Sequence, residues 1–205
     1  MSTGRNSHKV KPRTVFINVP YDNKYEPLYL ALIGGLTGFG LIPQAVLQIP
    51  GSRRRLDRLF SLMYSCRHSF HDLSRVELDL RPPRTPRFNM PFELGLAVAW
   101  ANSVDRRHNW YVLETKNYRV AKSLSDLDGT QIYVHGGTPK GVLRPLMNAL
   151  ARMKRQPTFG ELDAIYNDLK RAAAGIKKDH GTLYDTRPFL DLVFTASVIA
   201  RKHIR

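Results

Sequence analysis

The sequence has few of the features that mark exported, membrane-spanning or metal-binding proteins. It contains one cysteine, Cys66, which excludes an intramolecular disulfide, and its histidines show no zinc-ligand spacing. No apolar run reaches the ~20 residues that a membrane span requires; residues 28–41 come closest, and glycines interrupt them. Residues 1–13 are polar and basic, without the apolar stretch of a secretory signal. These absences predict a cytoplasmic protein with no membrane span and no metal site.

Two common catalytic motifs are also missing. No G-x-x-x-x-G-K-[ST] segment is present, which argues against a P-loop, and the glycines at 34, 35, 38 and 40 belong to a predicted helix and its end. No G-x-S-x-G segment is present, which argues against a serine nucleophile of the α/β-hydrolase kind. The residues that carry a function must therefore be sought elsewhere.

Acidic residues are scarce relative to basic ones. The chain contains 17 Asp and Glu and 32 Lys and Arg, so its formal net charge is +15. This excess favours an anionic partner, such as a nucleotide, a phosphorylated substrate, an acidic protein or nucleic acid. The basic residues are scattered and form no platform interleaved with aromatics, so nucleic-acid binding, which would be strongly salt-dependent, ranks last among these.

The chain does contain a regular alternation of strand-like and helix-like segments. Short β-branched and aromatic runs alternate five times with segments of helical periodicity, which is typical of a parallel sheet covered on both faces. We therefore expect a flavodoxin-like, five-stranded parallel α/β sheet. Pro27 and Ser52 are expected to begin two of the helices. The expected strands are residues 14–19, 41–49, 69–73, 110–114 and 131–135, and the expected helices are residues 28–38, 53–66, 92–102, 118–127 and 140–154.

Beyond this alternation the chain continues as helices alone. Gln156 and Pro157 break the pattern, Thr158 is placed to cap a helix over residues 159–176, and residues 188–204 form a last apolar helix. We therefore divide the chain into a disordered lead-in (1–13), an α/β domain (14–155) and a helical C-terminal extension (156–205). The apolar stripe of the extension must be buried against the sheet edge, a second copy or a partner protein, and the last helix favours a homo-oligomer.

In an open parallel sheet, ligands bind at the carboxyl ends of the strands, near the switch point in strand order. Polar residues follow two predicted strands and precede one predicted helix at this edge. We expect them to form the binding site. The candidates are Asn18, Pro20, Tyr21, Asp22, Asp72, Ser74, Arg75, Asn89, Met90 and Glu93.

Among the candidates, Glu93 has the side chain best suited to a catalytic role. It is expected in the first turn of an otherwise apolar helix, where a carboxylate is favoured by the helix dipole by about 0.3–1 kcal/mol. Alternatively, it lies at the floor of a cleft, where it would act as a nucleophile or stabilise an oxocarbenium-like transition state. Asp72 has a similar pair of interpretations, because it would either cap the end of a strand or bind a ribose hydroxyl.

Three segments carry a resemblance to a known family. VFINVPYD, HDLSRVELD and PRFNMPFELGLA, in this order, resemble bacterial proteins related to TIR domains and to nucleoside 2-deoxyribosyltransferases. The resemblance covers about residues 14–150. It implies that Glu93 is the catalytic carboxylate that acts at the anomeric carbon while an N-glycosidic bond breaks. It also implies a first substrate loop that holds base and sugar (Asn18, Tyr21 and Asp22) and a loop that meets ribose or phosphate (Asp72, Ser74 and Arg75).

The resemblance implies an N-glycosidase that cleaves NAD or a related nucleotide as substrate, without a bound cofactor. Residues 88–91 stand where deoxyribosyltransferases carry an aspartate, which favours hydrolysis or nucleotide binding over base exchange. In related bacterial proteins such an activity often serves antiviral defence. The alternative is a TIR-like module that recognises a nucleotide or a partner or sensor protein, and that self-associates without chemistry.

Overall fold

The computed structural model describes residues 11–48, 54–75, 82 and 84–204. Its centre is one sheet of five parallel strands in the order β2-β1-β3-β4-β5, which confirms the predicted flavodoxin-like α/β fold. The strand order reverses direction between β1 and β3, so the switch point lies there. The strands are β1 (Lys11–Asn18), β2 (Ile42–Gln44), β3 (Cys66–Asp72), β4 (Asn109–Glu114) and β5 (Ile132–Val134).

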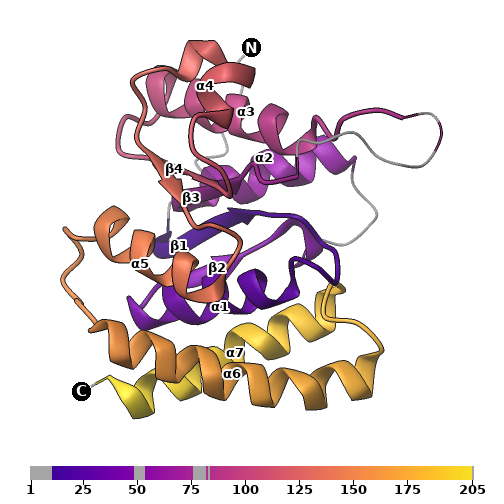
Figure 1. Cartoon of the computed structure of the whole chain (residues 1–205), viewed down its shortest axis with the longest axis vertical. Helices are drawn as coiled ribbons and strands as arrows, with labels where there is room; N and C mark the ends of the chain where they lie inside the picture. The colour runs from indigo at the N-terminus through magenta and orange to yellow at the C-terminus, as the bar shows by residue number, and fades with distance from the viewer. Residues whose placement is uncertain (1–10, 49–53, 76–81, 83, 205) are drawn as a thin grey trace, which may run out of the picture.

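Helices cover both faces of the sheet, as predicted. In Figure 1, α2, α3 and α4 lie on one side of the sheet, α1 and α5 lie on the other, and α6 and α7 form a further layer beyond α1. The helices are α1 (Glu26–Gly38), α2 (Arg55–Ser65), α3 (Asn89–Ser103), α4 (Arg119–Ser123), α5 (Pro139–Ala149), α6 (Phe159–His180) and α7 (Thr186–His203).

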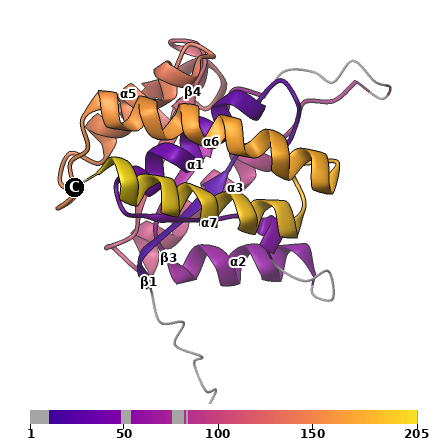
Figure 2. The ribbon, with the colours of Figure 1, turned by 90° about the horizontal axis from the view of Figure 1, so that it is seen from below.

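Helix α1 is apolar around its whole circumference because it is covered on every side. All of its residues from 28 to 38 are buried, since the sheet lies on one side and α6 and α7 cross the other (Figure 2). A Cβ at Gly35 would come within 2.5 Å of Leu146 in α5, and one at Gly38 within 2.5 Å of Leu162 in α6. These two glycines therefore allow α5 and α6 to pack closely on α1.

The C-terminal helices share the main core of the sheet domain. Thr158 forms a capping box with Glu161 at the start of α6, which confirms the predicted cap. The predicted apolar stripe of α6 is buried against α1. Helix α7 buries most of its apolar residues, but Leu190 and Phe194 are 42% and 71% exposed. The homo-oligomer expected from this helix stays a prediction.

Several element boundaries differ from the prediction. Strand β1 begins at Lys11, within the expected lead-in, because its backbone pairs with the start of β3 at Cys66. Strand β2 ends at Gln44, and the chain then forms a short 3₁₀ helix, Val46–Gln48. Helix α4 is one short turn, followed by a second 3₁₀ helix, Ser125–Leu127.

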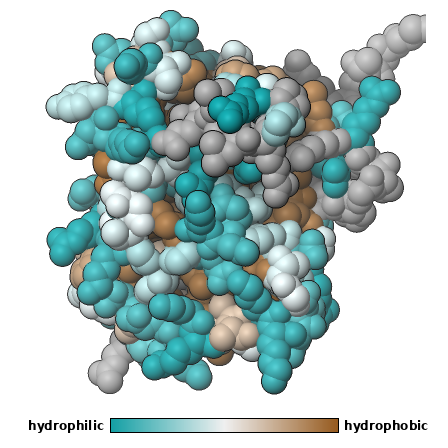
Figure 3. All heavy atoms as spheres, turned by 45° about the vertical axis from the view of Figure 1, so that its right-hand side comes forward, coloured by the Kyte–Doolittle hydropathy of each residue, from teal (hydrophilic) through white to brown (hydrophobic). Residues whose placement is uncertain are grey.

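Some of the predictions fall on residues that the structure does not describe. These are the disordered state of residues 1–10, the cap at Ser52 and the last four residues of the HDLSRVELD segment. Among the described residues, no helix combines the length and apolar composition needed to cross a membrane. The face in Figure 3 is mostly hydrophilic, with apolar residues in separate patches.

Candidate functional site

The carboxyl ends of β1 and β3 meet the start of α3 at the switch point. Asn18, the last residue of β1, donates its side-chain amide to the carbonyl of Met90 at 3.1 Å. The same Nδ2 atom lies 3.0 Å from Nδ1 of His71, in β3. Asn18 therefore joins three of the segments that the sequence placed at one edge of the sheet.

His71 begins a chain of hydrogen bonds whose directions are fixed by its two ends. Nδ1 of His108 lies 3.0 Å from the Cys66 carbonyl, which only accepts, so this nitrogen carries a proton. Nε2 of His108 must then accept from the hydroxyl of Ser69 (2.9 Å), and that hydroxyl accepts from Nε2 of His71 (2.9 Å). Nδ1 of His71 is left to accept from Asn18. Both imidazoles are therefore neutral.

Burial lowers the pKa of His71 to about 3, and it lowers the pKa of His108 as well. In the unfolded chain a histidine has a pKa near 6.5. As the pH falls below ~6.5, these histidines become protonated in the unfolded state but stay neutral in the folded state. Their contribution to the free energy of unfolding is therefore complete above this pH and is lost progressively toward pH 3.

We expect His71→Gln to flatten the pH dependence of stability. Each such histidine contributes up to about 1.4 kcal/mol per pH unit in this window, so the variant should lose less stability between pH 6.5 and pH 4 than the unmodified chain. Urea unfolding at a series of pH values measures this difference. The control is Asn102→Gln, an exposed residue without a titratable group near the end of α3, which should leave the slope unchanged. Equal slopes in all three proteins would contradict the assignment.

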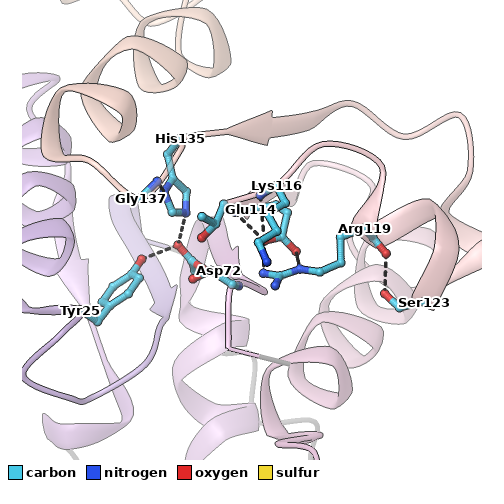
Figure 4. Close-up of polar contacts among 10 residues, drawn as sticks. Tyr25, Asp72, Glu114, Lys116, Arg119, Ser123, His135 and Gly137 are labelled. Carbon is cyan, nitrogen blue, oxygen red and sulfur yellow. Dashed lines mark hydrogen bonds and ion pairs between the residues drawn. The ribbon is translucent and has the colours of Figure 1, made fainter. Parts of the chain in front are cut away.

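Asp72, at the carboxyl end of β3, is a fully buried carboxylate. Its Oδ1 accepts from the backbone N–H of Ser74 at 2.8 Å and from the Ser74 hydroxyl. Its Oδ2 accepts the hydroxyl of Tyr25 at 2.5 Å and lies 3.1 Å from Nε2 of His135. Figure 4 shows Tyr25 and His135 approaching this carboxylate from two sides. Asp72 therefore ties together the loops that follow β1, β3 and β5.

The partners of Asp72 are all oriented as donors. The backbone N–H of Gly137 donates to Nδ1 of His135 at 3.0 Å, so the proton of the neutral ring sits on Nε2 and faces Asp72. This contact is electrostatic rather than an aligned hydrogen bond. Burial, and then the Asp72 carboxylate, raise the pKa of Tyr25 well above its usual range, which keeps the phenol protonated. This pattern supports the interpretation of Asp72 as a residue that fixes the ends of loops.

Gly141 controls where His135 lies. A Cβ at this position in the first turn of α5 would overlap the carbonyl oxygen of His135 and come within 2.8 Å of the Thr138 hydroxyl. We expect Gly141→Ala to displace His135 from Asp72 and to destabilise the fold by about 2 kcal/mol or more, because backbone and not a flexible side chain must move. The matched control is Gly160→Ala in α6, where a Cβ would meet no atom of the described residues within 4 Å. A thermal denaturation midpoint of Gly141→Ala equal to that of the control would contradict this prediction.

The loop after β1 is held on the α1 side of the sheet. The carboxylate of Asp22 pairs with Nε of Arg75 at 3.2 Å, and the backbone carbonyl of Asp22 accepts the Tyr184 hydroxyl at 2.6 Å. The ring of Tyr21 packs against those of Tyr29 and Tyr184, with centroids 6.3 and 5.9 Å away. Asp22 and Arg75, which come from two different loops, therefore lie together, and Tyr21 packs within a group of aromatic rings.

Glu93 lies on the opposite, α3 side of the sheet. Glu93 is 8% exposed and belongs to the buried stripe of α3 that also contains Leu94, Ala97 and Ala101. The helix begins at Asn89 and not at residue 92, so Glu93 is its fifth residue and the first turn contains no acidic residue. The expectation of a first-turn carboxylate is therefore wrong. A favourable interaction with the helix dipole no longer explains why a carboxylate stands at position 93.

The other predicted residues differ in exposure. Pro20 is buried, Met90 is half-buried and Asn89 is exposed at the first position of α3. Ser74 is buried and bonded to Asp72. Of this group, only Asn89 and Met90 present side-chain surface beside the switch point.

Sequence reasoning missed three polar residues at this edge. Tyr25 and His135 contact Asp72, and Glu114 is buried at the end of β4, where it pairs with Arg119 (Figure 4). Glu114 and His135 end or directly follow predicted strands, so the strand-end rule that selected Asn18 would have selected both. Tyr25 does not stand at the end of a predicted strand, so this rule could not have selected it.

Within the described ranges, no group of three His, Cys, Asp or Glu residues is arranged to hold a metal ion. Comparisons of the chain with protein-family models, with curated proteins and with solved structures give no significant match. The function of this chain must therefore be inferred from the site geometry and from the three sequence segments.

Proposed function

We propose that this protein is an N-glycosidase-type hydrolase that cleaves NAD or a related nucleotide, with Glu93 as its central carboxylate. The observation that supports this proposal is the position of Glu93. It is a buried acidic residue on α3, one turn after Met90, whose carbonyl binds Asn18 at the switch point. Ligands of open parallel sheets bind at the carboxyl ends of the strands, near the switch point.

The proposed chemistry needs little more than a positioned carboxylate. The bond between C1′ of the ribose and the nicotinamide nitrogen breaks, and nicotinamide leaves as a neutral molecule with the electron pair. The Glu93 carboxylate stabilises the cationic C1′ or bonds to it. Water then adds at C1′, ADP-ribose forms and one proton is released to solvent. Because nicotinamide is cationic in NAD, no general acid is needed for its departure.

Two features of the loops support such a site. Asp22 and Arg75 form a partly exposed ion pair beside the carboxyl end of β1, on the α1 side of the edge and across it from Glu93, and Arg75 offers a guanidinium of the kind that binds phosphate oxygens. The interlocked contacts of Asp72 with Tyr25, Ser74 and His135 hold the surrounding loops in fixed positions. A rigid frame is what positioning of a reactive sugar requires.

The proposal is tested by incubating the full chain with NAD and separating the products by chromatography. We expect nicotinamide and ADP-ribose to appear in equal amounts. The assay is repeated at protein concentrations high enough to favour self-association, because the resemblance to TIR-like proteins implies that the enzyme is active only when it is assembled. NAD that stays intact at every protein concentration would contradict the proposal.

A non-catalytic nucleotide-binding module is the second candidate, and one observation favours it. Asp72, which the resemblance assigns to a ribose or phosphate loop, is fully buried and already bonded to its own chain. If this candidate is correct, isothermal titration calorimetry should detect NAD binding while the incubation yields no nicotinamide. Product release would exclude it.

A further inference from the structure

A cavity of about 640 Å³ lies at the amino-terminal edge of the sheet, opposite the edge that contains Asn18 and Asp72. Helix α5 runs back along the sheet and ends at Ala149, and the turn that follows forms one wall. Gln156 holds this turn by donating its amide to the carbonyls of Leu150 (2.9 Å) and Met153 (2.7 Å). The polar and aromatic side chains of the lining are Arg67, His68, Tyr111, Tyr133, Asn148 and Arg152.

The charged residues that line this cavity are basic, although the carboxylate of Asp105 lies close enough to interact with the charge of Arg67. Arg67 comes from the start of β3 and Arg152 from the turn after α5. Neither forms an ion pair within the part of the chain that the structure describes, and none of the residues lining the cavity is acidic. Guanidinium groups bind phosphate and carboxylate through paired hydrogen bonds. The partial negative charge at the end of α5 opposes an anion by only about 0.3–1 kcal/mol.

Aromatic rings form the floor of the cavity. The ring of Tyr111 stacks on Phe70 with centroids 4.5 Å apart, and Tyr133 and His68 flank it at 6.1 and 6.2 Å. His68 is buried, and its Nδ1 has no hydrogen-bond partner among the residues that the structure describes. Burial lowers the pKa of His68 to about 4, so its ring is neutral at pH 7 and adds an apolar face. Packing in the sheet holds these rings in place, which reduces the entropy lost when a planar group binds.

We propose that this cavity is a binding site for an organic anion that combines a planar ring with a phosphate, of the size of a nucleoside monophosphate. Its volume lies within the usual range of small-molecule sites. The ring would lie against Tyr111 and Tyr133, and the phosphate would bind Arg67 and Arg152. This site does not depend on Glu93 or on the proposed hydrolysis, because it is built from the other edge of the sheet.

The test measures binding of AMP to the full chain by isothermal titration calorimetry, with adenosine and inorganic phosphate as probes of the ring and the anion alone. We expect AMP to bind more tightly than either. Arg67→Gln combined with Arg152→Gln should weaken AMP binding at least tenfold. Arg201→Gln, an exposed arginine in α7, should leave it unchanged.

Three results would overturn the inference. The first is the absence of AMP binding at millimolar concentrations. The second is AMP binding that the double arginine variant does not weaken, or that Arg201→Gln weakens to the same extent. The third is adenosine or phosphate alone binding as tightly as AMP, because the ring and the anion would then not be recognised together.

Discussion

Replacing Glu93 with glutamine is expected to lower the rate of nicotinamide release from NAD by roughly a thousandfold. One positioned group that acts in the transition state commonly contributes 10²–10⁴-fold to rate. Glutamine keeps the shape of the side chain but removes the negative charge that would stabilise the cationic C1′. Because Glu93 is buried on α3 with little room for water, this charge acts over a short range in a weakly screening environment.

The matched control for this substitution is Asp179→Asn. Asp179 lies near the exposed end of α6, away from the carboxyl edge of the sheet, and its replacement should leave the rate unchanged. Circular dichroism and the unfolding midpoint establish that both variants are folded. A folded Glu93→Gln protein that releases nicotinamide at the original rate would remove Glu93 from the mechanism.

Replacing Asp72 with alanine is expected to destabilise the fold by about 3–5 kcal/mol. The substitution removes the acceptor of the Tyr25 hydroxyl and of the Ser74 backbone N–H and hydroxyl, and the negative partner of His135. These donors are buried, so water does not replace the lost contacts, and each unsatisfied group costs about 1–3 kcal/mol. Such a loss is a large part of the 5–15 kcal/mol that separates folded from unfolded states.

Urea unfolding of Asp72→Ala measures this loss against Asp126→Ala, a replacement of an exposed aspartate between α4 and β5. Tyr25→Phe should cost less, about 1–2 kcal/mol, because it removes one donor and leaves the other partners of Asp72 in place. The double variant should cost less than the sum of the two single changes. A loss below 1 kcal/mol for Asp72→Ala would show that the carboxylate does not hold the loops.

The sheet could be predicted from the sequence because its signals are local. Runs such as residues 14–19 alternate with helical periodicity, and right-handed crossovers leave few possible strand orders. Helix starts marked by Pro27 and Thr158 were also visible, since proline and threonine favour these positions for local reasons. The start of α3 was not visible, because Asn89 and Met90 carry no comparable signal and Pro91 suggested a later start.

The layering of the C-terminal helices depended on tertiary contacts. The apolar stripe of α6 predicted that this helix is buried on one face. It could not predict the helix on which it packs, because α1 lies more than 100 residues earlier in the chain. Gly38 in α1 makes this contact close, and in the sequence it marked only the end of a predicted helix.

The candidate site could be predicted in outline but not in the directions of its side chains. The strand-end rule placed Asn18, Asp22, Asp72 and Arg75 at one edge, where the structure puts them. It could not show that Asp72 faces inward to Tyr25 and His135, because that depends on which face of the sheet each side chain takes and on loops far apart in sequence. The pairing of Asp22 with Arg75 likewise required coordinates.

The most direct test of the proposed mechanism is a crystal structure of the Glu93→Gln protein with NAD bound. The mechanism predicts that C1′ of the nicotinamide ribose lies within about 3.5 Å of the side chain at position 93, beside the carboxyl ends of β1 and β3. Nicotinamide ribose bound anywhere else, including the cavity at the amino-terminal edge, would contradict it.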